Sequence, residues 1–141
     1  MKQTSFFGYY LQMFRNYAVF SGRTDRKAFW IAIAVHYVLV TILSTISSML
    51  SGYTAIITMD PDSSNPVAVI ISTIITLYTL AVIIPMTALG VRRLHDVNRS
   101  GWWLLIALTG IGSIVLLIWM IREGTEDTNL FGSDPHPIRQ Y

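Results

Sequence analysis

The sequence predicts an all-α integral membrane protein: three transmembrane helices, preceded by an N-terminal amphipathic helix that lies in the membrane interface. Charged residues make up 13% of the 141 residues, about half the roughly 25% of soluble domains. Hydrophobic residues make up 52%, and the mean hydropathy is +0.51. A soluble chain this short could not bury so much apolar surface in its own core. We therefore expect a single membrane domain over residues 1–141.

Three long segments contain no Asp, Glu, Lys or Arg, and they cover residues 28–59, 63–91 and 100–121. A helix needs about 20 apolar residues to cross a hydrocarbon core of roughly 30 Å. Within lipid the backbone must satisfy its own hydrogen bonds, and three segments cannot close a barrel, so helices are expected. We predict transmembrane helices at 29–50, 67–90 and 102–121, followed by a polar tail at 122–141.

The segment 5–20, before the first span, has a different pattern. A thin, weakly polar face follows helical spacing, and it consists of Gly8, Gln12, Arg15 and Val19. The opposite side is apolar, and it consists of Phe6, Tyr10, Met13, Phe14 and Tyr17. An aromatic-rich amphipathic stretch that is too polar to cross the membrane is typical of an interfacial helix. The alternative is that this helix packs against the bundle as ordinary core.

The positions of the basic residues predict the orientation, because Lys and Arg favour cytoplasmic loops. Five precede the first span: Lys2, Arg15, Arg23, Arg26 and Lys27. The first connection carries Asp60 and Asp62, and the second carries Arg92, Arg93 and Arg99. This alternation places the N-terminus in the cytoplasm and the C-terminus on the periplasmic or extracellular side. If the third segment, with Gly110 and Gly112 at its middle, turned back as a re-entrant hairpin, the tail would be cytoplasmic.

Small hydroxyl side chains recur at helical spacing within the spans, as at Ser44, Ser47 and Ser51. Such residues let helices approach closely and hydrogen-bond across the contact. We favour helix packing over a polar conduit for these stripes. His36 lies about two turns into the first span, where an ionisable residue suggests function. A neutral histidine bonded to a neighbouring helix is the simpler interpretation.

The densest polar stretch runs from Arg92 to Trp103. Arg92 and Asp96 are four residues apart and could pair on a continuing helix. Ser100 is placed to cap the third span, and Trp102 and Trp103 would then lie at headgroup level. A second stretch, residues 20–30, repeats this design with a Ser-Gly turn, basic residues and Trp30.

With the predicted orientation both stretches lie on the cytoplasmic side and could converge into one surface. Arginine forks bind phosphate oxygens, and basic pockets between helices suit anionic headgroups. The candidate binding residues are Arg23, Arg26, Lys27, Arg92, Arg93, His95, Asp96 and Arg99. The candidate interface anchors are Trp30, Trp102 and Trp103.

Other kinds of chemistry have little support. One histidine beside one acid, His95 and Asp96, is not a ligand set, since zinc takes three or four ligands. Ser100, the nearest hydroxyl, is expected to be occupied as a cap. We predict no catalytic residue, no metal and no cofactor. A net charge of +2 gives little electrostatic support for nucleic-acid binding, and there is no cysteine.

Three ordered motifs together resemble the bacterial inner-membrane family DUF805, whose function is unknown. They are F-S-G-R-x-x-R-K-x-F-W at residues 20–30, R-R-L-H-D-x-x-R-S-G-W-W at residues 92–103 and G…N-x-F-G-x-D-P at residues 124–135. Two positions depart from the pattern: Ala28 stands where Glu is frequent, and Thr109 stands where Pro is common. The resemblance implies a multi-pass protein of the bacterial inner membrane and names no activity.

The hypothesis that follows is a non-enzymatic membrane module that binds anionic lipid headgroups or a protein partner through its Arg-rich cytoplasmic face. The alternative is a subunit of a small oligomeric transporter or channel. The expected partners are membrane lipids, with a homo-oligomer or another membrane protein as a further possibility. The acidic, turn-rich tail from Gly124 to Pro135 is expected to form a structured turn that docks on the end of the bundle.

Overall fold

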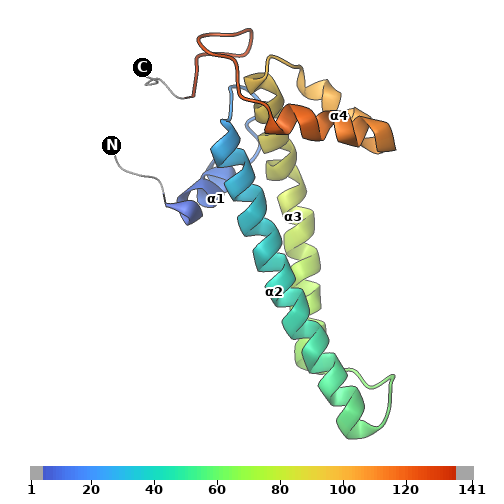
Figure 1. Ribbon diagram of the computed structural model, residues 1–141. Coiled ribbons are helices and arrows are strands. Elements are labelled where there is room, and N and C mark those ends of the chain that lie inside the picture. The colour runs from blue at the N-terminus through green and yellow to red at the C-terminus, as the bar shows by residue number, and fades with distance from the viewer. Residues whose placement is uncertain (1–4, 136–141) are drawn as a thin grey trace. The chain divides into compact units, whose positions relative to one another are not determined.

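The computed structural model describes residues 5–135, which form four α-helices and one 3-10 helix (Figure 1). They are α1 (Phe6–Arg15), α2 (Arg26–Thr58), α3 (Pro66–Asp96), the 3-10 helix η1 (Gly101–Leu108) and α4 (Gly110–Ile121). Within this range no strand forms, and the one bridge of β type joins Asn129 to Gly132. The all-α prediction is confirmed.

Helices α2 and α3 are long and apolar enough to cross a membrane. They contain 33 and 31 residues, which at 1.5 Å per residue corresponds to about 50 and 46 Å. Both are capped at their first turn. The backbone N–H of Ala28 donates to Oδ2 of Asp25 at 3.2 Å, and that of Val67 donates to Oδ1 of Asn65 at 2.9 Å. The predicted spans 29–50 and 67–90 lie inside these two helices.

The chain divides into two compact units, and the boundary runs through α2 and α3. We name residues 34–83 the apolar unit, and residues 1–33 with 84–141 the arginine-rich unit. In the apolar unit Nδ1 of His36 lies 2.9 Å from Oη of Tyr78, and Ser47 donates to the carbonyl of Ala68 at 3.0 Å. Both bonds join α2 to α3, so His36 and Ser47 serve helix packing, as the simpler interpretation predicted.

Helix α1 belongs to the arginine-rich unit and is shorter than the predicted segment 5–20, since it ends at Arg15. Tyr10 and Met13 are buried, whereas Phe6 and Phe7 are exposed. Part of the side that was predicted to face lipid therefore packs inside the unit. The helix therefore has features of both alternatives, because one side packs as core and another side exposes apolar residues.

The third apolar segment differs from the sequence prediction of one helix over residues 102–121. Thr109 adopts extended backbone angles, φ −108° and ψ 141°, and separates η1 from α4. Its Oγ1 accepts a hydrogen bond from the N–H of Gly112 at 3.0 Å, which caps α4. A Cβ at Gly112 would collide with the carbonyl of Ile106, so the tight turn requires glycine there. A capped break and an absent side chain outweigh the helical preference of the flanking apolar residues.

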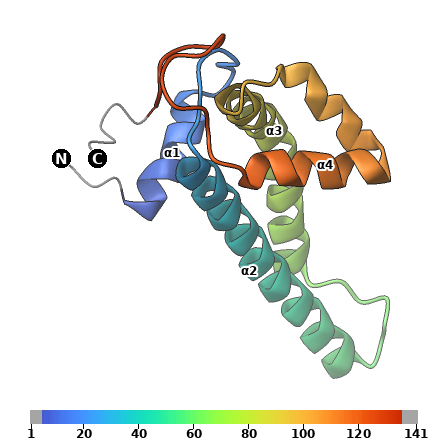
Figure 2. The same cartoon turned by 45° about the horizontal axis from the view of Figure 1, so that its top comes forward.

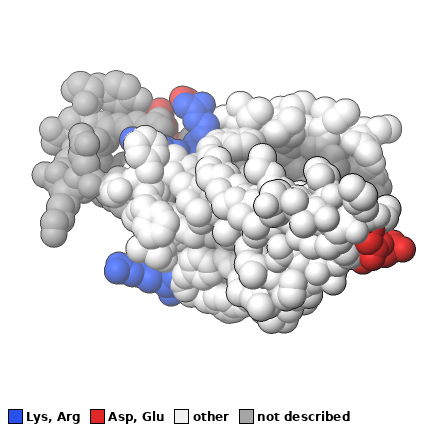
Figure 3. All heavy atoms as spheres, turned by 90° about the horizontal axis from the view of Figure 1, so that it is seen from below, with Lys and Arg blue, Asp and Glu red and all other residues white. Residues whose placement is uncertain are grey.

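The chain reverses direction at this break, and η1 and α4 lie side by side (Figure 2). Trp103, near the start of η1, packs edge-on against Trp119, near the end of α4, with ring centroids 5.3 Å apart. We name residues 101–121 the apolar hairpin. The apolar side chains at its turn are exposed: Leu108 is 87% and Ile111 is 81% exposed. In Figure 3 most of the atoms that are not grey belong to residues other than Lys, Arg, Asp and Glu.

Candidate functional site

The two basic stretches meet in the arginine-rich unit, as the sequence predicted. The backbone N–H of Thr24 donates to the carbonyl of Arg92 at 3.0 Å. Arg23 forms an ion pair with Asp96, with Nη2 2.9 Å from Oδ1. Since Arg23 precedes α2 and Arg92 and Asp96 end α3, these contacts join the segment before α2 to the last turn of α3.

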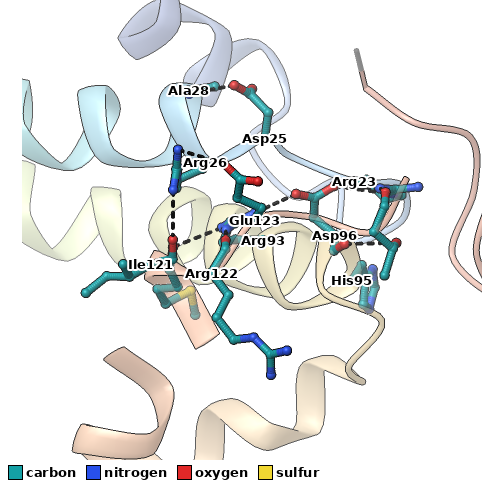
Figure 4. A network of polar contacts seen from close by, with 12 residues as sticks. Arg23, Asp25, Arg26, Ala28, Arg93, His95, Asp96, Ile121, Arg122 and Glu123 are labelled. Atoms are coloured by element: carbon teal, nitrogen blue, oxygen red, sulfur yellow. Dashed lines mark hydrogen bonds and ion pairs between the residues drawn. The ribbon is translucent and has the colours of Figure 1, made fainter. Parts of the chain in front are cut away.

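Asp96 lies at the centre of this junction, between Arg23 and Arg93 (Figure 4). Arg93 pairs with Asp96 one turn earlier on the same helix, and its side chain is fully buried. Burial raises the pKa of Asp96, and its hydrogen bond and charge contacts with the two arginines oppose that rise. Burial also lowers the pKa of Arg93, while Asp96 opposes this effect. Buried charges need such pairing, because an isolated ion in the interior is costly.

Arg93 also holds the end of the apolar hairpin. Its Nε donates to the carbonyl of Met120 at 3.2 Å, and its Nη2 donates to the carbonyl of Arg122. These carbonyls lie at the C-terminus of α4, where the last turn leaves oxygens without helical partners. A guanidinium at that position satisfies them and complements the helix dipole. The hairpin is therefore fastened to α3 at the end that carries the basic residues.

The tail is fastened to the same place. Thr125 donates its N–H to the carbonyl of Asp96 at 2.8 Å, and Asn129 donates its side-chain amide to the carbonyl of His95 at 2.9 Å. Arg23 donates to the carbonyl of Asp127 at 2.7 Å. A Cβ at Gly124 would collide with the Asp96 carboxylate. The tail thus docks as a structured turn, as the sequence predicted. The individual contacts that hold it were not predicted.

Arg92 is buried separately from this ion-pair cluster. Its Nε donates to Oγ1 of Thr24 at 3.2 Å, and its Nη1 donates to the carbonyls of Asn16 and Val19. Only 5% of the residue is exposed, and burial lowers its pKa. Arg92 does not pair with Asp96, although the four-residue spacing allowed it. The partner of Asp96 on α3 is Arg93, three residues away.

The ring of His95 contacts other protein groups. Its Nδ1 lies 3.1 Å from the carbonyl of Gly22, and its ring stacks on Phe131 with centroids 4.0 Å apart. Ser100 accepts a hydrogen bond from the N–H of Trp102, which is the expected cap. Among the described residues no group of three His, Asp or Glu side chains is arranged to hold a metal ion.

Three of the candidate basic residues remain exposed, and we name them the basic rim: Arg26, Lys27 and Arg99. Arg26 pairs with Glu123 at 3.3 Å, and both side chains are at least half exposed. Arg99 lies over the ring of Trp119 at 5.0 Å from its centroid, a cation–π arrangement. Lys27 has no partner within residues 5–135. The candidate site therefore divides into buried arginines, which donate hydrogen bonds to protein oxygens, and an exposed basic rim.

The three candidate anchors also differ from one another. Trp30 is half-buried and donates its indole N–H to the carbonyl of Met120 at 3.1 Å, so it ties α2 to α4. Trp103 packs on Trp119. Trp102 is 79% exposed and is the one that presents most of its ring outward.

Comparison with known proteins gives a family and no activity. The model of the family DUF805, described as a protein of unknown function, matches residues 17–133. The chain is 35% identical to the inner membrane protein YhaI of Escherichia coli over 128 residues, covering 90% of this chain and 94% of that protein. It is 33% identical to the inner membrane protein YhaH of the same organism over 132 residues, covering 90% and 95%. No solved structure matches the chain.

Proposed function

Because the chain belongs to the DUF805 family and its relatives YhaI and YhaH are inner membrane proteins, we propose that it is a non-enzymatic module of the bacterial inner membrane. Its cytoplasmic face binds anionic lipid headgroups. The observation that carries this proposal is the distribution of charge between the two units. Every described Lys and Arg lies in the arginine-rich unit, and the apolar unit contains only Asp60 and Asp62 as charged residues.

The basic rim supplies the headgroup contacts in this proposal. Arg26 and Lys27 begin α2, and Arg99 follows α3, so all three leave the membrane at the depth of the lipid phosphates. Near an anionic surface each Lys or Arg contributes about 1 kcal/mol. The ion pair of Arg26 with Glu123 does not compete strongly, since exposed pairs contribute about 0–1 kcal/mol.

The proposed topology has two full spans, α2 and α3, with the apolar hairpin entering the cytoplasmic leaflet and returning. Helix α4 has 12 residues, below the roughly 20 that a span needs. The tail is bonded to Arg23, His95 and Asp96, which belong to the basic ends assigned to the cytoplasm. The tail is then cytoplasmic as well, in contrast to the periplasmic tail that three complete spans would give. The exposed apolar side chains of Phe6 and Phe7 support a position of α1 in the same interface.

Cysteine labelling tests the topology, because the chain has no cysteine of its own. Ser133→Cys in the tail should react with a membrane-impermeant maleimide in inverted vesicles and stay unlabelled in spheroplasts. Ser64→Cys in the connection between α2 and α3 is the matched control and should show the opposite pattern. Labelling of Ser133→Cys from the outside of spheroplasts would overturn the two-span topology.

Lipid retention tests the basic rim. Arg26, Lys27 and Arg99 are replaced together by Gln, and the purified protein is examined by native mass spectrometry after extraction from phosphatidylglycerol and from phosphatidylcholine membranes. We expect the retained phosphatidylglycerol to fall at least threefold with no change for phosphatidylcholine. Asp60→Asn with Asp62→Asn, in the oppositely placed loop, is the control and should leave both unchanged. Undiminished retention in the rim variant would overturn headgroup binding by the basic rim and leave a protein partner for these three residues.

A further inference from the structure

A cleft of about 420 Å³ opens in the arginine-rich unit beside Arg92. It is lined by residues of α1, of the segment that joins α1 to α2, of the start of α2 and the end of α3, and by Pro135 of the tail. Its polar lining includes Tyr9, Gln12, Asn16, Thr24, Asp25 and Arg92. Met13 and Leu89 add apolar surface. Ligand sites typically have volumes of about 300–1,000 Å³ and combine apolar walls with a few polar groups.

Arg92 lines this cleft and keeps one donor group without a protein partner among the described residues. Its Nε and Nη1 are bonded to protein oxygens, whereas Nη2 has no hydrogen-bond partner within residues 5–135. No buried side-chain nitrogen or oxygen in that range lacks a partner. The Nη2 group is therefore not fully buried, and the residue that carries it lines the cleft.

Within residues 5–135 Arg92 also differs from the other two buried arginines in having no ion-pair partner. Arg23 and Arg93 share the carboxylate of Asp96. Arg92 forms no ion pair within the described part of the chain. The one carboxylate among the cleft residues is Asp25, which caps α2 through the N–H of Ala28. A buried cation without a counter-charge is costly, so the site favours an anion from outside.

We propose that this cleft binds the phosphate group of an anionic lipid headgroup, with Nη2 of Arg92 donating to a phosphate oxygen. Arg92 comes two residues after the predicted span 67–90, which places it at the depth of lipid phosphates. Guanidinium groups form strong charge-assisted hydrogen bonds to phosphate. The inference rests on the proposed function and adds a defined site to it. A free phosphate ester shares the same chemistry, and the experiment separates the two sources.

The test adds a carboxylate to the cleft while preserving the fold. Ala28 lines the cleft and is the third residue of α2. A Glu or Gln at this position after a capping Asp can bond back to the cap, as in a capping box. Ala28→Glu should therefore fold at least as well as the parent protein and fill the site with an internal anion. Ala28→Gln is the matched control, equal in size and uncharged.

Native mass spectrometry after extraction from phosphatidylglycerol membranes is the readout. We expect Ala28→Glu to lose at least fivefold in retained phosphatidylglycerol and Ala28→Gln to keep the level of the parent. Gln12→Glu brings the same charge from α1, where the side chain is exposed, and should reproduce the loss if changes at α2 disturb folding. Parent-like retention in both carboxylate variants would overturn the proposed site.

Titration of sn-glycerol 1-phosphate into the protein in phosphatidylcholine nanodiscs distinguishes lipid from free ester. We expect no binding of the free ester in these nanodiscs. We also expect that the ester does not displace the phosphatidylglycerol retained by protein extracted from phosphatidylglycerol membranes. Saturable binding that Ala28→Glu abolishes would overturn the lipid assignment in favour of a soluble phosphate ester. The rim variant separates this inference from the proposed function. If the rim variant loses lipid and Ala28→Glu does not, the cleft proposal fails and the proposed function stands.

Discussion

The apolar unit and the arginine-rich unit satisfy their polar groups by different means. In the apolar unit threonine hydroxyls bond within their own helix, as Thr45 does to the carbonyl of Thr41 at 2.8 Å and Thr76 to that of Ser72 at 2.9 Å. Few bonds cross from helix to helix. In the arginine-rich unit guanidinium groups reach across more than 70 positions of sequence, as Arg23 does to Asp96.

The difference follows from the surroundings that each unit is built for. In lipid an unsatisfied backbone group is costly, so a spanning helix closes its own hydrogen bonds and its hydroxyls add to them. At the membrane surface irregular segments must be held by side chains, because their carbonyls have no helical partners. Arginine suits this task, since its five donors reach several carbonyls at once. The comparison predicts that substitutions will cost far more in the arginine-rich unit than in the apolar unit.

The largest effect is expected for Arg93→Ala. It removes the fully buried ion pair with Asp96 and the bonds to the carbonyls of Met120 and Arg122. Breaking one partner of a buried pair costs about 3–5 kcal/mol. The unfolding free energy in detergent should fall by that amount, and the tail should become sensitive to protease. Arg93→Lys keeps the charge without the fork and should recover only part of the loss. Equal stability of parent and Arg93→Ala would break the comparison.

The next effect is expected for Gly124→Ala. The added Cβ would meet the Asp96 carboxylate, and crowding of this kind in a packed site costs about 1–3 kcal/mol. Thermal unfolding in detergent measures the loss. Gly110→Ala is the control, because a Cβ there meets nothing within 4 Å. A similar melting temperature for both variants would show that the tail shifts at Gly124 to accommodate the added Cβ at little cost.

A smaller effect is expected in the apolar unit for His36 and Tyr78. Tyr78→Phe removes the hydroxyl that lies 2.9 Å from Nδ1 of His36. Interhelical hydrogen bonds in membranes average about 0.6 kcal/mol. A double-mutant cycle with His36→Ala should give a coupling energy of that size. A coupling above about 2 kcal/mol would mean that the apolar unit also depends on a strong polar contact.

The smallest effect is expected for Glu123→Gln, which removes the ion pair with Arg26. Both side chains are at least half exposed, and such pairs contribute about 0–1 kcal/mol. The melting temperature should change little, and any change should shrink further in high salt. The same substitution should raise retention of phosphatidylglycerol, because it frees Arg26 for headgroups. A large loss of stability would place Glu123 in the buried network rather than on the rim.

Several elements could be predicted from local pattern alone. The uncharged segments indicated α2 and α3, because their length and composition do not depend on what they contact. The repeated basic-aromatic design of residues 20–30 and 92–103 indicated that the two stretches meet. The sequence also predicts helix packing for His36 and Ser47, because a polar side chain within lipid needs a hydrogen-bond partner on a neighbouring helix.

The break of the third apolar segment could not be predicted from its apolar pattern. The sequence shows Gly110 and Gly112, which allow either a continuous helix or a turn. The cap from Thr109 and the missing side chain at Gly112 select the turn. Arg93 then holds the end of α4 through the carbonyls of Met120 and Arg122, and Trp103 packs on Trp119 between the two halves of the hairpin.

The sequence by itself determined that this is a helical, apolar chain with its basic residues gathered at one end. Only the tertiary structure decided which arginines are buried against protein groups and which are exposed at the surface. Within residues 5–135 Arg23 and Arg93 share Asp96, Arg92 is buried without an ion pair, and Arg26, Lys27 and Arg99 remain exposed. The physical reason is that charge is a property of each residue, whereas desolvation and pairing depend on neighbours up to a hundred positions away.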